Sequence, residues 1–311
     1  MMTRIVFYCK VALLVGLALT MAACRQTNPS PGQTPTPGET ELSPTANGET
    51  ATQASGETPI PPATSLPLAA RVNGWEISLA EHQAELAMYQ AAVGRDLATE
   101  DEERVLDELI DQAILAQAAV EKGFVVDEAL LSERTNALQE QLGGEGALND
   151  WIAAHGYDQA AFQRALGRSA ASAWMRDQIA AEVPRVAEQI HARQVLLYSS
   201  DEAAQVLAEL ESGYDFGNMA RKYDPVTGGD LGWFPRGYLP DAKLEQAAFS
   251  LQPDQFSSVI ETLAGFHILQ VIERDPQRPL DPEALLILQN QAVQTWLQSQ
   301  RSQANIERLL P

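Results

Sequence analysis

The sequence is poor in cysteine and in clustered metal ligands. Its 311 residues include only Cys9 and Cys24, both near the amino terminus. The rest of the chain therefore cannot form a disulfide framework, a thiolate metal site or a cysteine nucleophile. His82, His155 and His191 stand far apart, without the spacing of metal ligands. We expect no metal ion and no other cofactor.

Basic residues are also scarce. Lys and Arg number 21 against 42 Asp and Glu, which gives a formal net charge of -21. Nucleic-acid binding needs clustered cations, so no nucleic-acid partner is expected. The nucleophile-elbow pattern G-x-S-x-G is missing. The stretch "GGEG" at 143–146 follows no strand and precedes no Lys, which indicates a linker and not a phosphate loop.

The first 23 residues have the layout of a secretory signal. Arg4 and Lys10 precede an apolar run that ends in small residues and is short for a membrane span. The following "MAAC" resembles the lipobox of bacterial lipoproteins, which implies acylation of Cys24 and an anchor on the outer face of the cell membrane. An ordinary signal peptide or a single anchor helix are the alternatives.

A tether and a helical segment follow. Residues 24–67 are rich in Pro, Thr, Ser and Gly, a composition typical of a disordered linker. In 68–186 we expect a short strand at 70–72, a turn at "NG" and a capping box formed by Ser78 and Glu81. Amphipathic helices then follow, two of which end at Gly123 and at the Gly pair 143–144.

The pattern changes near residue 187. "IHARQVLLY" reads as a strand, and three short helices follow, the first capped by Ser200. "DQFSSVIETLAGFHILQVIERD" reads as two strands joined by a turn at Ala264 and Gly265. After Pro279 and Pro282, residues 283–309 read as one helix, part of a final segment 280–311.

Three motifs in order carry a resemblance to a known family. "GGDLGWFPRGYLP", "LEQAAFSL" and "GFHILQV" make residues 187–276 similar to the parvulin, or PpiC-type, peptidyl-prolyl isomerases. The segment 68–186 resembles the chaperone domain of SurA-like and PrsA-like exported foldases. The resemblance implies an α+β protein: a helical chaperone domain, completed by a C-terminal helix, and a parvulin domain whose small, mostly antiparallel four-stranded sheet is covered by helices.

The resemblance also implies a site. His267 matches one histidine of the family, Gln194 stands where a second is often found, and Asp224 is the best match for a third polar member on a shortened loop. The expected proline pocket consists of Leu231, Phe234, Leu239, Leu244 and Phe249, of which Phe249 also suits the core.

Gln194 leaves the function open. Glutamine can donate and accept hydrogen bonds but carries no charge or transferable proton. Because prolyl isomerisation makes and breaks no covalent bond, this loss need not abolish turnover. The resemblance therefore implies a membrane-anchored, extracytoplasmic isomerase that also holds unfolded, proline-containing exported chains. The alternatives are a non-enzymatic holdase with a degenerate parvulin domain and a surface lipoprotein dedicated to one partner.

Overall fold

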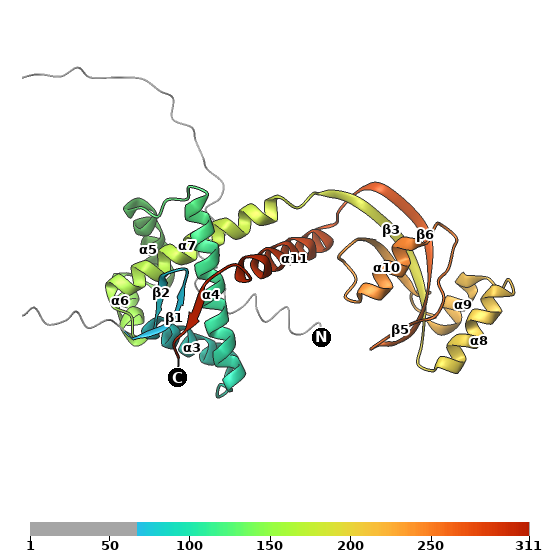
Figure 1. Ribbon diagram of the computed structural model, residues 1–311, viewed down its shortest axis with the longest axis horizontal. Coiled ribbons are helices and arrows are strands. Elements are labelled where there is room, and N and C mark those ends of the chain that lie inside the picture. Colours follow the sequence, from blue (N-terminus) through green and yellow to red (C-terminus); the bar gives the residue numbers. More distant parts are fainter. Residues whose placement is uncertain (1–66, 311) are drawn as a thin grey trace, which may run out of the picture. The chain divides into compact units, whose positions relative to one another are not determined.

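The computed structural model describes residues 67–310, which divide into two compact units (Figure 1). The first unit contains residues 67–110, 126–169 and 305–310, and the second contains 111–125 and 170–304. The expected signal, the acylated Cys24 and the tether up to residue 66 lie outside the described residues. The domain boundaries expected at 187, 276 and 280 stay predictions.

The first unit combines helices with a three-stranded sheet. Its elements are β1 (Leu68–Val72), β2 (Trp75–Ser78), α3 (Leu79–Val93), α5 (Glu128–Leu142), α6 (Glu145–Ala154) and β7 (Ile306–Arg308), with parts of α4 (Thr99–Glu121) and α7 (Gln159–Ala181). Within residues 67–310, no helix has both the length and the apolar character needed to cross a membrane.

Helix ends in this unit follow the local sequence. The Ser78 side chain accepts from the backbone N–H of Glu81, and the Glu81 carboxylate accepts from the backbone N–H of Ser78. This reciprocal pair satisfies donors that the first helical turn leaves free, and it confirms the predicted capping box. A second helix, α5, ends at Gly143, whose φ of 96° is a left-handed conformation that glycine adopts without strain.

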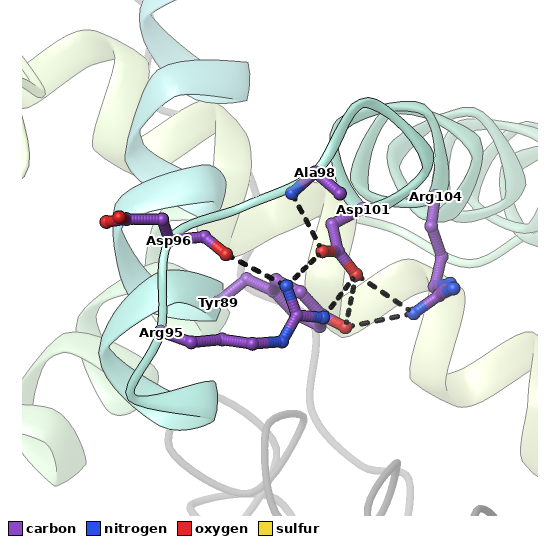
Figure 2. Close-up of polar contacts among 6 residues, drawn as sticks. All are labelled: Tyr89, Arg95, Asp96, Ala98, Asp101 and Arg104. Carbon is purple, nitrogen blue, oxygen red and sulfur yellow. Dashed lines mark hydrogen bonds and ion pairs between the residues drawn. The ribbon is translucent and has the colours of Figure 1, made fainter.

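The connection between α3 and α4 is held by a buried carboxylate (Figure 2). Asp101 is 3% exposed, and its two oxygens accept from both terminal nitrogens of Arg95 at 2.7 and 3.1 Å. The Ala98 N–H, the Tyr89 hydroxyl and Arg104 donate to the same carboxylate. The Arg95 guanidinium, with the backbone bond, lowers the pKa of Asp101 to about 2. The carboxylate is therefore charged throughout the physiological range.

The end of the chain forms a strand where a helix was predicted. The helix α11 (Pro282–Arg301) stops eight residues early, and β7 pairs antiparallel with β1. The sheet order is β2-β1-β7, so β1 has partners on both sides. Asn73 and Asn305 fix the start of this pairing, because the Asn73 N–H donates to the Asn305 carbonyl at 2.9 Å. Pairing with β1 outweighs the weak helical preference of "NIER".

The second unit contains the four-stranded antiparallel sheet that the resemblance implied. Its order is β4-β3-β6-β5. Besides α11, its elements are β3 (Val186–Leu197), α8 (Ser200–Glu211), α9 (Phe216–Tyr223), β4 (Asp230–Pro235), α10 (Ala242–Ser250), β5 (Ile260–Thr262) and β6 (Gly265–Pro279). With the helices, this sheet confirms the expected α+β class.

Helices cover both faces of this sheet (Figure 1). One face packs Val195, Leu197 and Ile268 against α8 and α9. The other packs Ile190, Ala192, Leu269 and Val271 against α10. This division follows from the alternation of side chains along each strand.

Two sequence assignments need correction. Ser199, not Ser200, caps α8, because the Ser199 hydroxyl accepts from the backbone N–H of Glu202. Leu231 lies on strand β4, a strand that the sequence pattern did not predict. Two glycines within and beside this strand hid its alternation.

Candidate active site

Gln194 and His267 lie on neighbouring central strands and on the same face of the sheet. Gln194 of β3 pairs with Leu269 of β6, and Leu196 pairs with His267. Directly opposed residues in an antiparallel pair share a face, as do residues two apart on one strand. Leu269 packs in the cluster under α10. The side chains of Gln194, Leu196 and His267 therefore also lie on the α10 side of the sheet.

His267 is hydrogen-bonded through both ring nitrogens. Its Nδ1 is 2.8 Å from the Gln194 Oε1, and its Nε2 is 2.9 Å from the Thr262 Oγ1. A carbonyl oxygen can only accept, so Nδ1 carries the proton, and Nε2 of the neutral ring accepts from the Thr262 hydroxyl. The ring is 4% exposed. Burial lowers the pKa of His267, with the Asp241 carboxylate acting in the opposite direction, so the ring is neutral at physiological pH.

Thr262 is a member of the site that the sequence did not reveal. It pairs with Gly265 across a two-residue turn at 263 and 264, and its Oγ1 also accepts from the Ala264 N–H at 3.0 Å. We expected this turn one residue further along the chain. A shift of one residue exchanges the two faces of a strand, which is why Thr262 could not be assigned to the site.

Asp224 lies at the end of α9, where its contacts are local. Its carboxylate accepts from the backbone N–H groups of Val226 and Thr227 at 3.0 and 3.1 Å, and from the Thr227 hydroxyl. These bonds, first of all that of the Thr227 side chain, hold the pKa of Asp224 below its usual range. Among residues 67–310, no hydrogen bond joins Asp224 to the histidine, so its catalytic role stays a prediction.

The five expected pocket residues belong to a single apolar cluster on the α10 side of the sheet. Phe234 is fully buried and Phe249 is 6% exposed, so these two rings form the packed base of the cluster, 6.1 Å apart in an edge-to-face arrangement. Leu231, Leu239 and Leu244 pack against the same cluster but keep part of their surface in solvent. These three leucines are available to contact a bound group.

Gly229 allows the close approach that places Gln194. The Gln194 N–H donates to the Gly229 carbonyl at 2.8 Å. A Cβ on Gly229 would lie 1.9 Å from the Gln194 carbonyl oxygen, and φ is +70°. Only glycine fits at this position, because any side chain would displace the strand that carries the site.

An arginine fixes α10, the helix that packs over the apolar cluster. Arg274 of β6 donates to the carbonyls of Phe249 and Leu251, at 2.9 and 2.7 Å, at the carboxyl end of α10. Glu188 of β3 holds the same guanidinium at 2.6 Å. Arg236 stacks on the Phe249 ring, 4.1 Å from its centre. Together these contacts tie α10, and with it Leu244 and Phe249, to the sheet.

Sequence comparison relates this chain to known foldases. Residues 178–273 match the family model of the rotamase, or PPIC-type PPIase, domain. The foldase protein PrsA of Oceanobacillus iheyensis is 27% identical over 215 residues, which cover 64% of this chain and 66% of that protein. The chaperone SurA of Ralstonia nicotianae is 35% identical over 125 residues, 35% of this chain and 25% of that protein. The matches thus span less than two thirds of either relative.

Solved structures include a similar protein. Peptidylprolyl isomerase PrsA from Bacillus anthracis aligns with 64% of this chain and 96% of its own, at 21% identity and a TM-score of 0.42. The family match and the relatives together decide the assignment. Residues 178–273 are therefore a parvulin domain of the PPIC type, and the chain is similar to PrsA foldases and SurA chaperones.

Proposed function

We propose that this protein catalyses cis/trans isomerisation of X-Pro peptide bonds in unfolded exported polypeptides. The observation that carries the proposal is the buried His267, bonded to Gln194 and Thr262, on the same sheet face as an apolar cluster with three partly exposed leucines. The match of residues 178–273 to the rotamase family model supports the reaction class.

The proposed chemistry needs a pocket and oriented polar groups. The barrier to rotation about the peptide bond is about 18–20 kcal/mol because the amide is conjugated, and no nucleophile or cofactor is required to lower it. In this proposal Leu231, Leu239 and Leu244 contact the prolyl ring. The polar groups near His267 then favour the twisted amide over the planar one.

In the proposed reaction, Gln194 orients His267 and offers a hydrogen-bond donor to the substrate. Its carbonyl oxygen is used by His267, whereas none of the hydrogen bonds among residues 67–310 uses its amide nitrogen. That NH₂ group is a donor for a substrate carbonyl. Gln194 thus both fixes the histidine tautomer and supplies a neutral donor, without carrying a proton.

A protease-coupled assay on a proline-containing peptide tests the isomerase. His267→Ala should lower kcat/KM about tenfold or more, since it removes the centre of the polar network. His191→Ala is the matched control. Its neighbours Ile190 and Ala192 face α10, so His191 points to the opposite face of the sheet. There its Nε2 lies 2.8 Å from the Asp230 carboxylate. Equal rates for wild type and His267→Ala would show that the site is wrong.

A non-enzymatic holdase is the second candidate. It is favoured by glutamine at the position where parvulins often carry histidine, and by the local contacts of Asp224. In this reading the first unit holds unfolded chains, and the parvulin domain binds proline segments without turnover. A wild-type protein that suppresses aggregation of an unfolded client, yet gives no rate above the uncatalysed one, would establish it and exclude the enzyme.

Acylation of Cys24 and an extracytoplasmic location complete the proposal. They are supported by the "MAAC" stretch after an apolar segment. Cys24→Ala should move the protein from the membrane fraction to the soluble fraction. Unchanged membrane association would disprove the lipid anchor and leave the isomerase proposal intact. A lipoprotein serving a single partner would instead copurify with that partner from detergent extracts.

A further inference from the structure

The helix α11 touches the loop that borders the pocket. The Gln291 side chain donates from Nε2 to the Gly237 carbonyl at 2.5 Å. A Cβ on Gly237, where φ is +85°, would lie 2.7 Å from Gln291 Oε1 and 2.9 Å from Leu288 Cδ2. The side chains of α11 are therefore packed directly against the backbone of this loop.

The loop at 236–241 carries part of the apolar cluster. Tyr238 stacks on Phe234 with ring centres 6.3 Å apart, and Leu239 packs against the same cluster. Burial raises the pKa of the Tyr238 phenol, and the carboxylates of Glu283 and Asp281, at the start of α11, add to the rise. Gly237 and Tyr238 of this loop thus both lie close to α11.

Gly237 connects α11 with α10. Its N–H donates to the Glu245 carboxylate of α10 at 2.6 Å, while its carbonyl accepts from Gln291 of α11. The two bonds use both backbone polar groups of one residue. The position of Leu239, two residues further on, therefore depends on both helices.

Other contacts hold α11 in place within the second unit. Gln289 donates to the Ala180 carbonyl of α7 at 3.2 Å, and Arg301 pairs with Asp111 of α4 at 2.5 Å. Leu297 is 4% exposed and Ala284 is fully buried. Because these contacts hold α11 at separate positions along its length, it can act as a fixed support for the loop.

We propose that Gln291 of α11 is a positioning residue of the peptide pocket, which holds the loop at 236–241 so that Leu239 is preordered for the prolyl ring. This inference rests on the proposed function for its substrate, but the contact itself does not. Preordering a loop lowers the entropic cost of binding, so its loss should weaken binding and leave the chemical step unchanged.

The test compares Gln291→Met with Gln294→Met in the full chain. Methionine keeps the length of glutamine but cannot donate, and Gln294 is an exposed glutamine on the same helix. We expect Gln291→Met to raise KM for the proline peptide about fivefold at constant kcat, the effect of one ordinary hydrogen bond. Gln294→Met should match wild type. Gly237→Ala, which pushes against α11, should act in the same direction as Gln291→Met.

Hydrogen exchange separates this inference from the isomerase proposal. In Gln291→Met, the amides of 236–241 should exchange about fivefold faster, while those of β3 and β6 are unchanged. Unchanged exchange in 236–241, or a fall in kcat without a rise in KM, would overturn the positioning role. An inactive wild type would remove the isomerase proposal, and the exchange rates alone would then decide the role of Gln291.

Discussion

At the scale of single residues, Gln194 decides which ring nitrogen of the neutral His267 carries the proton. An amide oxygen is a fixed acceptor over the whole pH range, whereas a second histidine could exchange donor and acceptor roles. The proton of the neutral imidazole is thereby held on Nδ1, and Nε2 is directed at Thr262. Thr262 therefore controls the side of the ring that Gln194 does not reach.

Replacing Thr262 tests that control. Thr262→Val keeps the shape of the side chain but removes the hydroxyl, so we expect kcat to fall about five- to tenfold, as for the loss of one buried hydrogen bond. Thr262→Ser, which restores the hydroxyl, should recover most of the rate. The measurement is the protease-coupled assay with thermal unfolding as a check on folding. Equal activity of the Val and Ser variants would contradict the role.

A second residue-scale prediction concerns Glu85 of α3. Burial, the largest cause, raises the pKa of Glu85 to about 7; Arg168 opposes the rise, and Glu108 and Glu81 add to it. The folded state then binds more protons than the unfolded state between pH 4.5 and 7, so stability falls as pH rises across this window. We expect Glu85→Gln to remove this slope and to raise the free energy of unfolding at pH 8 by about 1–2 kcal/mol.

Urea unfolding at pH 5 and pH 8 measures the effect. Glu133→Gln, which changes an exposed carboxylate on α5, is the control and should keep the wild-type slope. A Glu85→Gln variant whose stability changes with pH as much as that of wild type would show that another group causes the slope.

The site residues differ in whether the local sequence around them could reveal them. His267 and Gln194 could be expected together because their strands resemble the segments that carry two histidines in the family, and the five apolar residues because they accompany further family motifs; their roles stay predictions. The structure adds that these five apolar residues pack in one cluster. Thr262 depends on the register of a three-residue strand, and Gln291 on a contact 54 positions away. Neither relation leaves a periodic pattern in the sequence.

At the scale of elements, α10 depends on Arg274 for its place over the sheet. Removing the guanidinium leaves the last carbonyls of α10 and Glu188 without their partner. We expect Arg274→Met to lower the free energy of unfolding by about 2–3 kcal/mol, in proportion to the number of bonds lost. Arg236→Met, at a more exposed site 3.8 Å from the same Glu188, should cost about 1 kcal/mol or less.

Guanidinium unfolding followed by circular dichroism distinguishes the two arginines. Equal losses for Arg274→Met and Arg236→Met would mean that the helix-end bonds add little. A larger loss for Arg236→Met would reverse the assignment of the anchor.

Most elements could be read from the sequence, and the exceptions share a cause. The start of α3 at Ser78 and the end of α5 at Gly143 are marked by signals in the local sequence. By contrast, β7 has no local signature: it is a strand because β1 offers a free edge far away in the chain, and Arg71 of β1 pairs with Glu307 at 3.0 Å. Pairing at long range overrides a weak local preference.

At the scale of the whole molecule, the net charge of -21 should act on every encounter with the proposed unfolded clients. A surplus of carboxylates attracts cationic chains and repels acidic ones, and salt screens the effect over about 10 Å at 0.1 M. In stopped-flow mixing we expect the association rate of a basic unfolded client to fall about tenfold between roughly 20 and 200 mM salt. An acidic client of the same length should associate faster as salt rises. Rates independent of salt for both clients would show that charge does not guide capture.

The pairing of β1 with β7 also sets an order of folding events during synthesis. Arg71 and Glu307 are 236 positions apart, so the three-stranded sheet cannot close until nearly all described residues have emerged. Residues 111–125 and 170–304, the whole of the second unit, emerge earlier. A chain delivered from its amino terminus therefore finishes the parvulin domain first and the sheet of the first unit last.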